Sequence, residues 1–295
     1  MSEKKSLRVG SWNTRFGSAD PSFVVPHELD LLLLQEMTPN AFEAFRECFA
    51  DGVHSIGPVL YPNGPPAGHG VAVLWSSRLA GRGARVLPYL VAPHRFLVCD
   101  LAFTERRGYF QACAYHALNG EQGEDGFDKP RMTYQVARWL EEQPGPVILG
   151  MDANSPDVDH PDFARTRCHF DWLGPRHLER ALLGPEAKHR CRDVYRSLVD
   201  AKPQLLAEIV SARSDGPLAV SHRAGRNEHR AGDPQRFDHI FATWPDFGVK
   251  DAGYDYEGAC DAGSDHALVV AELEVDLVGG SRSEADMLLP TAIAP

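Results

Sequence analysis

Side chains able to bind a cation or to move protons occur in six short segments of this sequence, each beside a predicted strand. The segments read SWNTR, LLLLQEM, CAYHALNG, ILGMDANS, RFDHIF and GSDH. They supply carboxylates, carboxamides and imidazoles, namely Asn13, Glu36, His116, Asn119, Asp152, Asn154, Asp238, Asp265 and His266. If the strand ends meet at one edge of layered sheets, these groups form a single site.

Oxygen-bearing side chains of this kind suit a hard divalent cation. Mg²⁺ prefers oxygen ligands and keeps several waters, so one or two carboxylates and an amide oxygen are enough to hold it. No cluster of soft ligands accompanies the set, which favours Mg²⁺ or Mn²⁺. Hydrolysis of a phosphate ester needs such a metal, an aligned water and groups that transfer protons. The set therefore predicts metal-dependent phosphoester hydrolysis.

Each of these residues also has a simpler structural explanation. Asp152 and Asn154 follow a strand, where a turn selects both side chains because they cap backbone groups. His116 and His266 could be hydrogen-bonded strand residues. Glu36 follows four leucines and a glutamine, and an unpaired carboxylate is unfavourable to bury there, so a metal or a basic partner is expected. The six segments taken together favour a site.

The elements that must position these groups are short and rich in apolar residues. Strand patterns are found at 7–12, 29–35, 70–76, 95–103, 109–115, 146–152, 236–243 and 266–275. Helical spacing is clear at 39–50 and 129–143, and two further candidates are 192–200 and 202–210. Because strands and helices do not alternate strictly, we expect antiparallel or mixed sheets covered by helices.

The composition predicts one domain. The 295 residues are 43% hydrophobic, enough for one large core. We place the domain at 7–277, after a short charged lead at 1–6 and before a flexible tail at 278–295. The net charge of −11 does not attract a polyanion at long range, so contact with nucleic acid must be local.

No secretory leader is visible, and the apolar run LDLLLLQE is too short to cross a bilayer. We therefore expect a cytoplasmic protein without a membrane anchor, whose oligomeric state the sequence leaves open. Six cysteines without a Cys-x-x-Cys pair are typical of free thiols in a reducing compartment. Cys168, His169, His189 and Cys191 could supply four zinc ligands, but their spacing fits no common zinc module.

The ordered motifs resemble those of the endonuclease/exonuclease/phosphatase superfamily, in particular its deoxyribonuclease-like and abasic-endonuclease-like members. The resemblance spans roughly residues 7–275, and the segments RDVYRSL and HALN are similar to further motifs of the nuclease members. It implies an α/β fold: a four-layered sandwich with two mixed, mainly antiparallel sheets packed face to face and flanked by helices. It also implies divalent-metal-dependent hydrolysis of phosphoesters in DNA, RNA, inositol phosphates or phospholipids.

The resemblance implies how the metal is held. Glu36 corresponds to the main metal ligand, Asn13 lies beside it, and Asp265 binds or supports the metal. The implied cofactor is Mg²⁺ or Mn²⁺. Arg15 stands where many abasic-site endonucleases carry an acidic residue. This difference argues against a repair role and against a second carboxylate at the metal site.

The resemblance also implies the catalytic roles. Asp152 would orient or deprotonate the attacking water, and Asn154 would hold a phosphate oxygen. Asp238 would accept the ring N–H of His266 and so fix its tautomer. His266 and His116 would share phosphate stabilisation and acid–base work.

Two features depart from the family pattern around these residues. In the deoxyribonuclease-like members, the histidine that corresponds to His116 has an acidic partner from the preceding sheet. No Asp or Glu occurs between Gly52 and Cys99 in this sequence. Its role as a general acid therefore has less support than that of His266. Met151 also stands where glycine is usual.

Arginines concentrate in two segments, RHLERALLGPEAKHRCRDVYR and SHRAGRNEHRAGDPQRFDH. They could line a groove for substrate phosphates, or they could be solvated loops with compensating acids. The candidate substrate-binding residues are Asn119, Arg192, Arg196, His222, Arg223 and Arg226.

Three functions are compatible with the motifs. They are a nuclease (endo- or exonuclease), a phosphatase or phospholipase C/sphingomyelinase-like esterase of the same superfamily, and a catalytically silent binding module. The presence of all core polar positions argues against the silent module. The Asp-x-x-Arg pattern of RDVYRSL and the arginine-rich segment before Asp238 favour phosphodiester hydrolysis with nucleic acid as the partner. The negative net charge and Arg15 leave small or lipid phosphoesters open.

Overall fold

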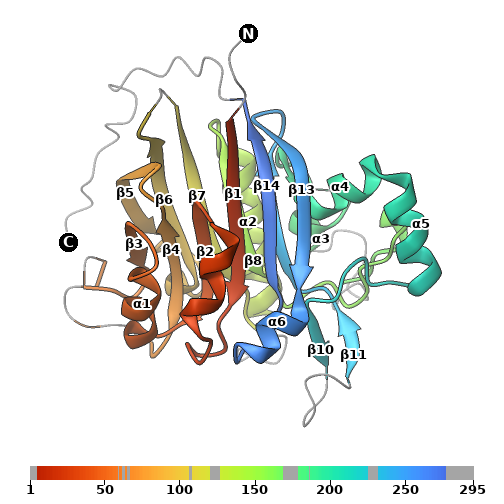
Figure 1. Ribbon diagram of the computed structural model, residues 1–295, viewed down its shortest axis with the longest axis horizontal. Helices are drawn as coiled ribbons and strands as arrows, with labels where there is room; N and C mark the ends of the chain where they lie inside the picture. The colour runs from red at the N-terminus through yellow and green to blue at the C-terminus, as the bar shows by residue number, and fades with distance from the viewer. Residues whose placement is uncertain are drawn as a thin grey trace.

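Two β-sheets form the centre of the computed structural model, which describes residues 5–58, 60–61, 64, 67–105, 108–119, 127–168, 179–185, 187–224 and 232–276 (Figure 1). Within those residues each sheet has six strands. The first has the order β13 (Phe247–Asp255), β14 (Leu268–Val275), β1 (Lys5–Asn13), β2 (Leu31–Met37), β4 (Gly70–Trp75) and β3 (Asp51–His54). The second has the order β5 (Leu79–Val86), β6 (Phe96–Phe103), β7 (Tyr109–His116), β8 (Val147–Asp152), β12 (Asp238–Thr243) and β9 (Cys191–Asp193).

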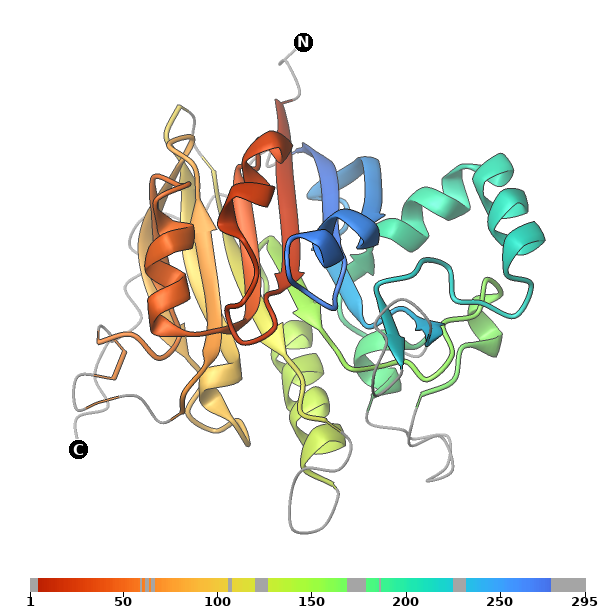
Figure 2. The ribbon, with the colours of Figure 1, turned by 60° about the horizontal axis from the view of Figure 1, so that its bottom comes forward.

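Helices cover the outer face of each sheet, which gives four layers (Figure 2). On the first sheet, α1 (Pro39–Arg46) packs Phe42 and Phe45 into a cluster with Leu32 and Leu34, and α6 (Tyr256–Asp261) joins the same cluster. On the second sheet lie α2 (Asp128–Glu142) and α3 (Arg180–Leu183). The remaining elements are α4 (Val194–Ala201), α5 (Pro203–Ala212), the 3-10 helices η1 (Pro21–His27), η2 (Pro93–Arg95) and η3 (Phe163–Arg165), and the pair β10 (His222–Ala224) and β11 (Asp233–Gln235).

The leucine run of β2 shows why the sheets pack in this way. Leu31 and Leu33 point into the core between the two sheets, where they meet residues of β6, β7 and β8. Leu32 and Leu34 point to the opposite face and contact the helices. All four are fully buried, so the strand has no solvent-facing side and its sequence is a continuous apolar run.

The register of the strands brings the motif residues to one end of the sandwich. β1 runs parallel to β2 and pairs Asn13 with Gln35. In the second sheet, β7 runs parallel to β8 and pairs His116 with Asp152, which also pairs with Asp238 on the antiparallel β12. Four strand ends and the beginning of β12 therefore lie at the same edge.

The predicted α/β sandwich is confirmed, and all eight predicted strands form. The predicted helices also form, at 39–46, 128–142, 194–201 and 203–212. The pattern missed β3, β5, β9, β10, β11, β13, α3 and α6. β1 begins at Lys5, two residues before the expected start, and the expected tail at 278–295 lies outside the described residues. In the described part of the chain, every helix is too short or too polar to cross a membrane.

Candidate active site

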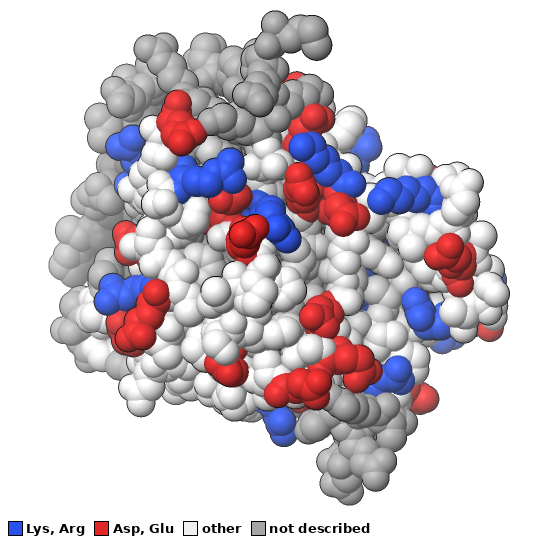
Figure 3. Space-filling model, in the orientation of Figure 1, with Lys and Arg blue, Asp and Glu red and all other residues white. Residues whose placement is uncertain are grey.

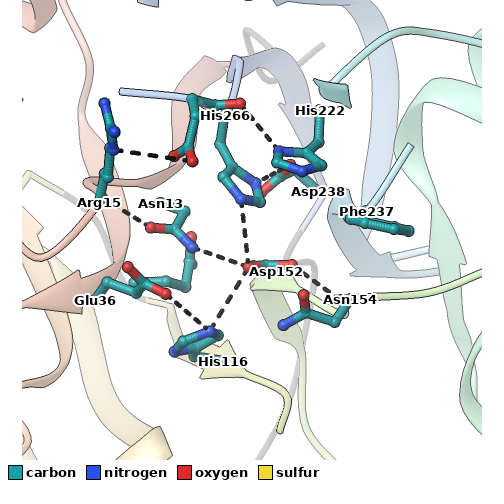
Figure 4. A network of polar contacts seen from close by, with 12 residues as sticks. Asn13, Arg15, Glu36, His116, Asp152, Asn154, His222, Phe237, Asp238 and His266 are labelled. Carbon is teal, nitrogen blue, oxygen red and sulfur yellow. Dashed lines mark hydrogen bonds and ion pairs between the residues drawn. The ribbon is translucent and has the colours of Figure 1, made fainter. Parts of the chain in front are cut away.

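The Asp152 carboxylate, at the end of β8, is the centre of a buried polar network (Figure 4). Its Oδ2 accepts a hydrogen bond of 2.9 Å from the side-chain amide of Asn13, and its Oδ1 accepts one of 2.9 Å from the backbone N–H of Asn154. Its Oδ2 also lies 3.7 Å from Nε2 of His116 and 3.9 Å from Nε2 of His266. Both sheets thus contribute to the surroundings of one carboxylate.

Asp238 and His266 form a buried pair at the beginnings of β12 and β14. Nδ1 of His266 donates to Oδ2 of Asp238 over 2.9 Å, and Ser221 Oγ accepts the backbone N–H of Asp238. Burial alone would lower the pKa of His266, but the carboxylates of Asp238 and Asp152 outweigh it and raise that pKa to about 10. The imidazole is therefore held as a cation at neutral pH, with its Nε2 directed at Asp152.

Glu36 reaches the site through an irregularity in β2. The β2–β4 register shifts between Leu34 and Met37, and Glu36 has a φ of 53°. Such bulges redirect a side chain at the cost of a less favourable backbone conformation. The Glu36 carboxylate accepts the N–H of Phe16 over 3.1 Å and lies 3.6 Å from Nε2 of His116.

The electrostatics of Glu36 favour a cation beside it. Burial and the nearby Asp152 raise the pKa of its carboxyl group, which means that the charged form is poorly compensated by the protein. Among the described residues, no lysine or arginine forms an ion pair with Glu36. The Glu36 carboxylate, without a lysine or arginine partner and near a second carboxylate, fits the ligand preference of Mg²⁺ or Mn²⁺.

Asn13 and Asp265 lie near this carboxylate but already have partners. The side-chain oxygen of Asn13 accepts the N–H of Arg15 over 2.9 Å, while its amide nitrogen holds Asp152. Nε of Arg15 lies 3.9 Å from Oδ2 of Asp265. Arg15, which stands where related endonucleases carry an acidic residue, therefore places its positive charge beside Asp265, one of the predicted metal ligands.

A second arrangement of potential ligands shares Asp152. One atom from each of Asp152, Asp238 and His266 lies within 4.8 Å of the others, and all three residues are buried. A metal ion could be held there if His266 offered a bare nitrogen. The raised pKa of His266 and its bond to Asp238 oppose that state.

Asn154 and Asn119 differ in how they are held. Asn154 has a φ of 47°, and its side-chain amide donates to the carbonyl of Ala117 over 3.1 Å. Its own carbonyl accepts from Nζ of Lys129 over 2.6 Å, which ties the end of β8 to α2. Asn119 is exposed, two residues beyond Ala117. Asn154 is therefore hydrogen-bonded within the network, whereas Asn119 lies at the edge of the site and is exposed to solvent.

His116 has a basic neighbour in place of an acidic one. Nη1 of Arg95, at the end of η2, lies 3.2 Å from Nδ1 of His116. Burial, and then Arg95, hold the pKa of His116 well below its usual range. The absence of acids between residues 52 and 99 was visible in the sequence, but the approach of Arg95 depends on tertiary packing.

His222 is closer to the Asp238–His266 pair than its place in an arginine-rich segment indicated. Its ring stacks on that of His266 with centroids 4.5 Å apart and an interplanar angle of 29°, and on that of Phe237 at 5.6 Å and 21°. Its Nδ1 donates to the backbone carbonyl of Asp265 over 3.1 Å. β10 thus lies beside this pair.

Arg196, predicted to bind substrate, is held by contacts inside the protein. The side chain is buried, and its guanidinium donates to the carboxylate of Asp159 and to the carbonyls of His160 and Pro161. Asp159 and Asp193 also bind the buried Arg236. The Asp-x-x-Arg segment, Asp193 to Arg196, is therefore part of an internal ionic network that holds the Arg196 guanidinium.

The other predicted basic residues have different positions. Arg192 is exposed and stacks over Trp244 at 4.9 Å. Arg223 is half-buried beside His222 and donates to the carbonyl of Gly232 over 3.1 Å. Arg226, and His169 of the alternative zinc set, lie outside the described residues.

Comparison with known proteins gives a match to a model described as the endonuclease/exonuclease/phosphatase family over residues 10–266. No curated protein matches the sequence. Among solved structures, an endonuclease/exonuclease/phosphatase from Bacteroides vulgatus is 17% identical, with 92% of this chain and 100% of that chain covered and a TM-score of 0.62.

Two further structures extend the range of activities seen with this fold. D. rerio TDP2 complexed with a single-strand DNA product is 15% identical, with 91% of this chain and 99% of that one covered and a TM-score of 0.58. The Bacteroides thetaiotaomicron mannosyl-6-phosphatase Bt3783 is 17% identical, with 90% and 99% covered and a TM-score of 0.55. At these identities the likeness establishes a shared fold.

Proposed function

The chain belongs to the endonuclease/exonuclease/phosphatase family, and on that premise we propose that it is a divalent-metal-dependent phosphoesterase that hydrolyses phosphodiester bonds, with nucleic acid as the substrate class. One observation carries the proposal. The buried Asp152 carboxylate lies between Glu36 and the Asp238–His266 pair, held by Asn13 and by the Asn154 backbone. A carboxylate fixed between a cation site and an imidazolium is suited to directing a water at a phosphorus atom.

Each residue of the network has a role in this reaction. Asp152 orients the attacking water and accepts its proton. His266, held as a cation, donates a hydrogen bond to the phosphate through Nε2 and stabilises the charge that develops there. Asp238 fixes the orientation and tautomer of His266 by accepting from Nδ1. Asn154 is the candidate for a contact with a phosphate oxygen.

The metal in this proposal is Mg²⁺ or Mn²⁺. Glu36 would be its main protein ligand, with Asn13 and Asp265 beside it. When bound, it supplies positive charge to the phosphate oxygens and lowers the barrier to attack. The half-buried Glu36, with a raised pKa and no basic partner among the described residues, is the observation that supports this placement.

Nucleic acid is favoured as the substrate by the residues around the network. His222 and Arg223 lie on β10 beside the catalytic pair, and Phe16 exposes 60% of its surface next to Arg15. Basic side chains beside an exposed aromatic ring suit a phosphodiester chain with bases that can stack. D. rerio TDP2, which shares the fold, was crystallised with a single-strand DNA product.

A phosphatase acting on a small phosphomonoester is the second candidate. The Arg196 guanidinium is held by the Asp159 carboxylate, which weakens the support for one predicted contact with a nucleic-acid phosphate. Acidic and basic side chains are interspersed on the face shown in Figure 3, and the net charge is −11. The mannosyl-6-phosphatase with the same fold shows that this scaffold also serves a sugar phosphate.

A substrate panel tests the proposal and separates the candidates. Purified protein with Mg²⁺ or Mn²⁺ is incubated with single- and double-stranded DNA, RNA, inositol phosphates, phospholipids and sugar phosphates. Asp152→Asn is the control, because it keeps the shape and removes the charge that directs the water. We expect cleavage of nucleic acid by the wild type and a loss of at least about a hundredfold in the variant. Turnover of sugar phosphates alone would establish the second candidate, and equal rates for both proteins would reject the site.

A further inference from the structure

Arg95 is a buried arginine behind the proposed catalytic centre. It is 8% exposed, and its Nη1 donates to the carbonyl of Ala117 over 3.3 Å as well as approaching Nδ1 of His116 at 3.2 Å. Its Nη2 lies 3.5 Å from Nε2 of His69. Buried arginines usually pair with carboxylates. Among the described residues Arg95 forms no such ion pair, so its donors are directed at imidazoles and a carbonyl.

The contact between Arg95 and His116 determines which ring nitrogen carries the proton. A guanidinium has five N–H donors and no acceptor. The nitrogen that it approaches must therefore offer a lone pair, which makes Nδ1 of His116 the acceptor. In a neutral imidazole the proton then sits on Nε2.

The protonated nitrogen faces the reaction centre. Nε2 of His116 lies 3.6 Å from Oε1 of Glu36 and 3.7 Å from Oδ2 of Asp152. An N–H in this position points to the space between the two carboxylates, where the proposed substrate phosphate would approach. A neutral ring whose only proton is on Nε2 donates a hydrogen bond well, but it is far too weak an acid to give that proton away.

We propose that Arg95 is a positioning residue that holds His116 as the Nε2–H tautomer, so that His116 serves the reaction as a fixed hydrogen-bond donor and not as a general acid. The inference rests on the proposed phosphoester hydrolysis for its functional part. Acid catalysis then falls to His266 alone. An acidic partner at the position of Arg95 would accept from Nδ1–H and impose the opposite tautomer, with a bare Nε2 at the reaction centre.

The tautomer can be measured without any substrate. Long-range ¹H–¹⁵N spectra distinguish the two neutral forms of histidine because the protonated and bare nitrogens have well separated shifts. The His116 signals are identified by their absence in His116→Gln. We expect Nε2–H in the wild type and in Arg95→Lys, which keeps a donor, and a mixture in Arg95→Met. An Nδ1–H form in the wild type would overturn the proposal.

Kinetics on the substrate found by the panel test the functional part. The amide nitrogen of glutamine can replace an Nε2–H donor, so His116→Gln should keep kcat within about tenfold of the wild type while His116→Ala loses about a hundredfold. Equal losses in both variants would restore a general-acid role and contradict the inference. A wild type inactive on every substrate would instead count against the proposed function, and the spectra would still decide the tautomer.

The Arg95 variants need a matched control. Arg95→Met should lower kcat by about 10- to 100-fold with little change in KM, as expected when the partner that orients an active-site histidine is removed. Arg85→Met removes an arginine that pairs with Asp100 at 2.7 Å on β5 and β6, and it should leave kcat unchanged. Thermal unfolding of each variant shows whether a lost rate reflects lost folding. A folded Arg95→Met with the wild-type kcat would contradict the positioning role.

Discussion

Nδ1 of His266 lies 2.9 Å from Oδ2 of Asp238, and the two side chains are 9% and 0% exposed. The pair connects the first sheet to the second, because His266 precedes β14 and Asp238 begins β12. Its geometry requires the face-to-face packing of both sheets, so the catalytic proposal and the fold depend on each other. Variants of this pair can therefore show whether its residues contribute to the reaction rate or only to the stability of the fold.

A double-mutant cycle tests whether Asp238 acts through His266. Asp238→Asn and His266→Ala should each lower kcat by about a hundredfold or more. The double variant should be little slower than His266→Ala alone, because without the imidazole the carboxylate has nothing to orient. The measurement is kcat of all four proteins beside their thermal unfolding. Independent, multiplicative losses would show that Asp238 has another role, and losses explained by unfolding would leave the pair structural.

The stability that His266 contributes should decrease as the pH rises. Asp238 and Asp152 outweigh the effect of burial and raise its pKa from 6.5 to about 10 in the folded protein. A group whose pKa is raised on folding stabilises the folded state, and this stabilisation is complete at pH values below the pKa of the unfolded state. It is lost as the pH rises through the pKa of the folded state. The stability advantage of the wild type over His266→Gln should therefore shrink between about pH 6.5 and pH 10. Urea unfolding of metal-free protein at several pH values measures it, and an advantage that grows with pH would contradict the charged pair.

Chelation should abolish activity, and Mg²⁺ or Mn²⁺ should restore it. Glu36→Gln should weaken metal binding by at least about tenfold, because a neutral amide replaces the main anionic ligand. Calorimetric titration with Mg²⁺ measures the affinity in the absence of substrate. Asp238→Asn is the informative comparison, since Asp238 belongs to the alternative set with Asp152 and His266. Binding lost in Asp238→Asn and kept in Glu36→Gln would move the metal to that set.

Much of the fold could be predicted from the sequence, and four of the six strands that were missed lie at the edges of the two large sheets. β13, β3, β5 and β9 are the four edge strands of the two sheets. Edge strands have fewer neighbours and more solvent contact, so their sequences lack a continuous apolar pattern. β5 reads LAGRGARV and β13 reads FGVKDAGYD. The central strands, buried on both faces, gave the clear signal.

The candidate site was predictable where a residue type follows directly from its place at a strand end. Asp152, Asp238 and His266 are of this kind, and the structure brings them together. The partners that decide their chemistry were not predictable, because Arg95 reaches His116 and His222 reaches His266 only through tertiary packing. The ion pair of Arg196 was missed for the same reason, since a basic side chain in a charged segment gives no sign of the buried Asp159 that binds it.

Replacement of Arg196 should therefore affect stability and not the chemical step. Arg196→Met removes a buried partner of Asp159 and should lower the free energy of unfolding by about 3 kcal/mol. This value lies at the lower end of the range for breaking a buried ion pair, because Arg236 remains bound to the same carboxylate. Arg131→Met, at an exposed arginine of α2, is the control. Urea unfolding and kcat per folded molecule are the measurements. A stable variant with a raised KM would return Arg196 to the substrate-binding set.

Arg223 follows His222, whose ring stacks on that of His266, and Arg226 lies in the same basic segment. If they contact phosphates, the double variant Arg223→Ala with Arg226→Ala should bind single-stranded DNA more weakly. The slope of log K against log salt should also fall by about 0.7 per lost phosphate contact, because each contact releases condensed counterions. Arg46→Ala with Arg85→Ala, on α1 and β5, removes the same charge elsewhere and should leave the slope nearly unchanged. Binding is measured with catalytically inactive Asp152→Asn as the background. Equal affinity and slope in both double variants would show that these arginines do not contact the strand, and the phosphomonoester candidate would then be preferred.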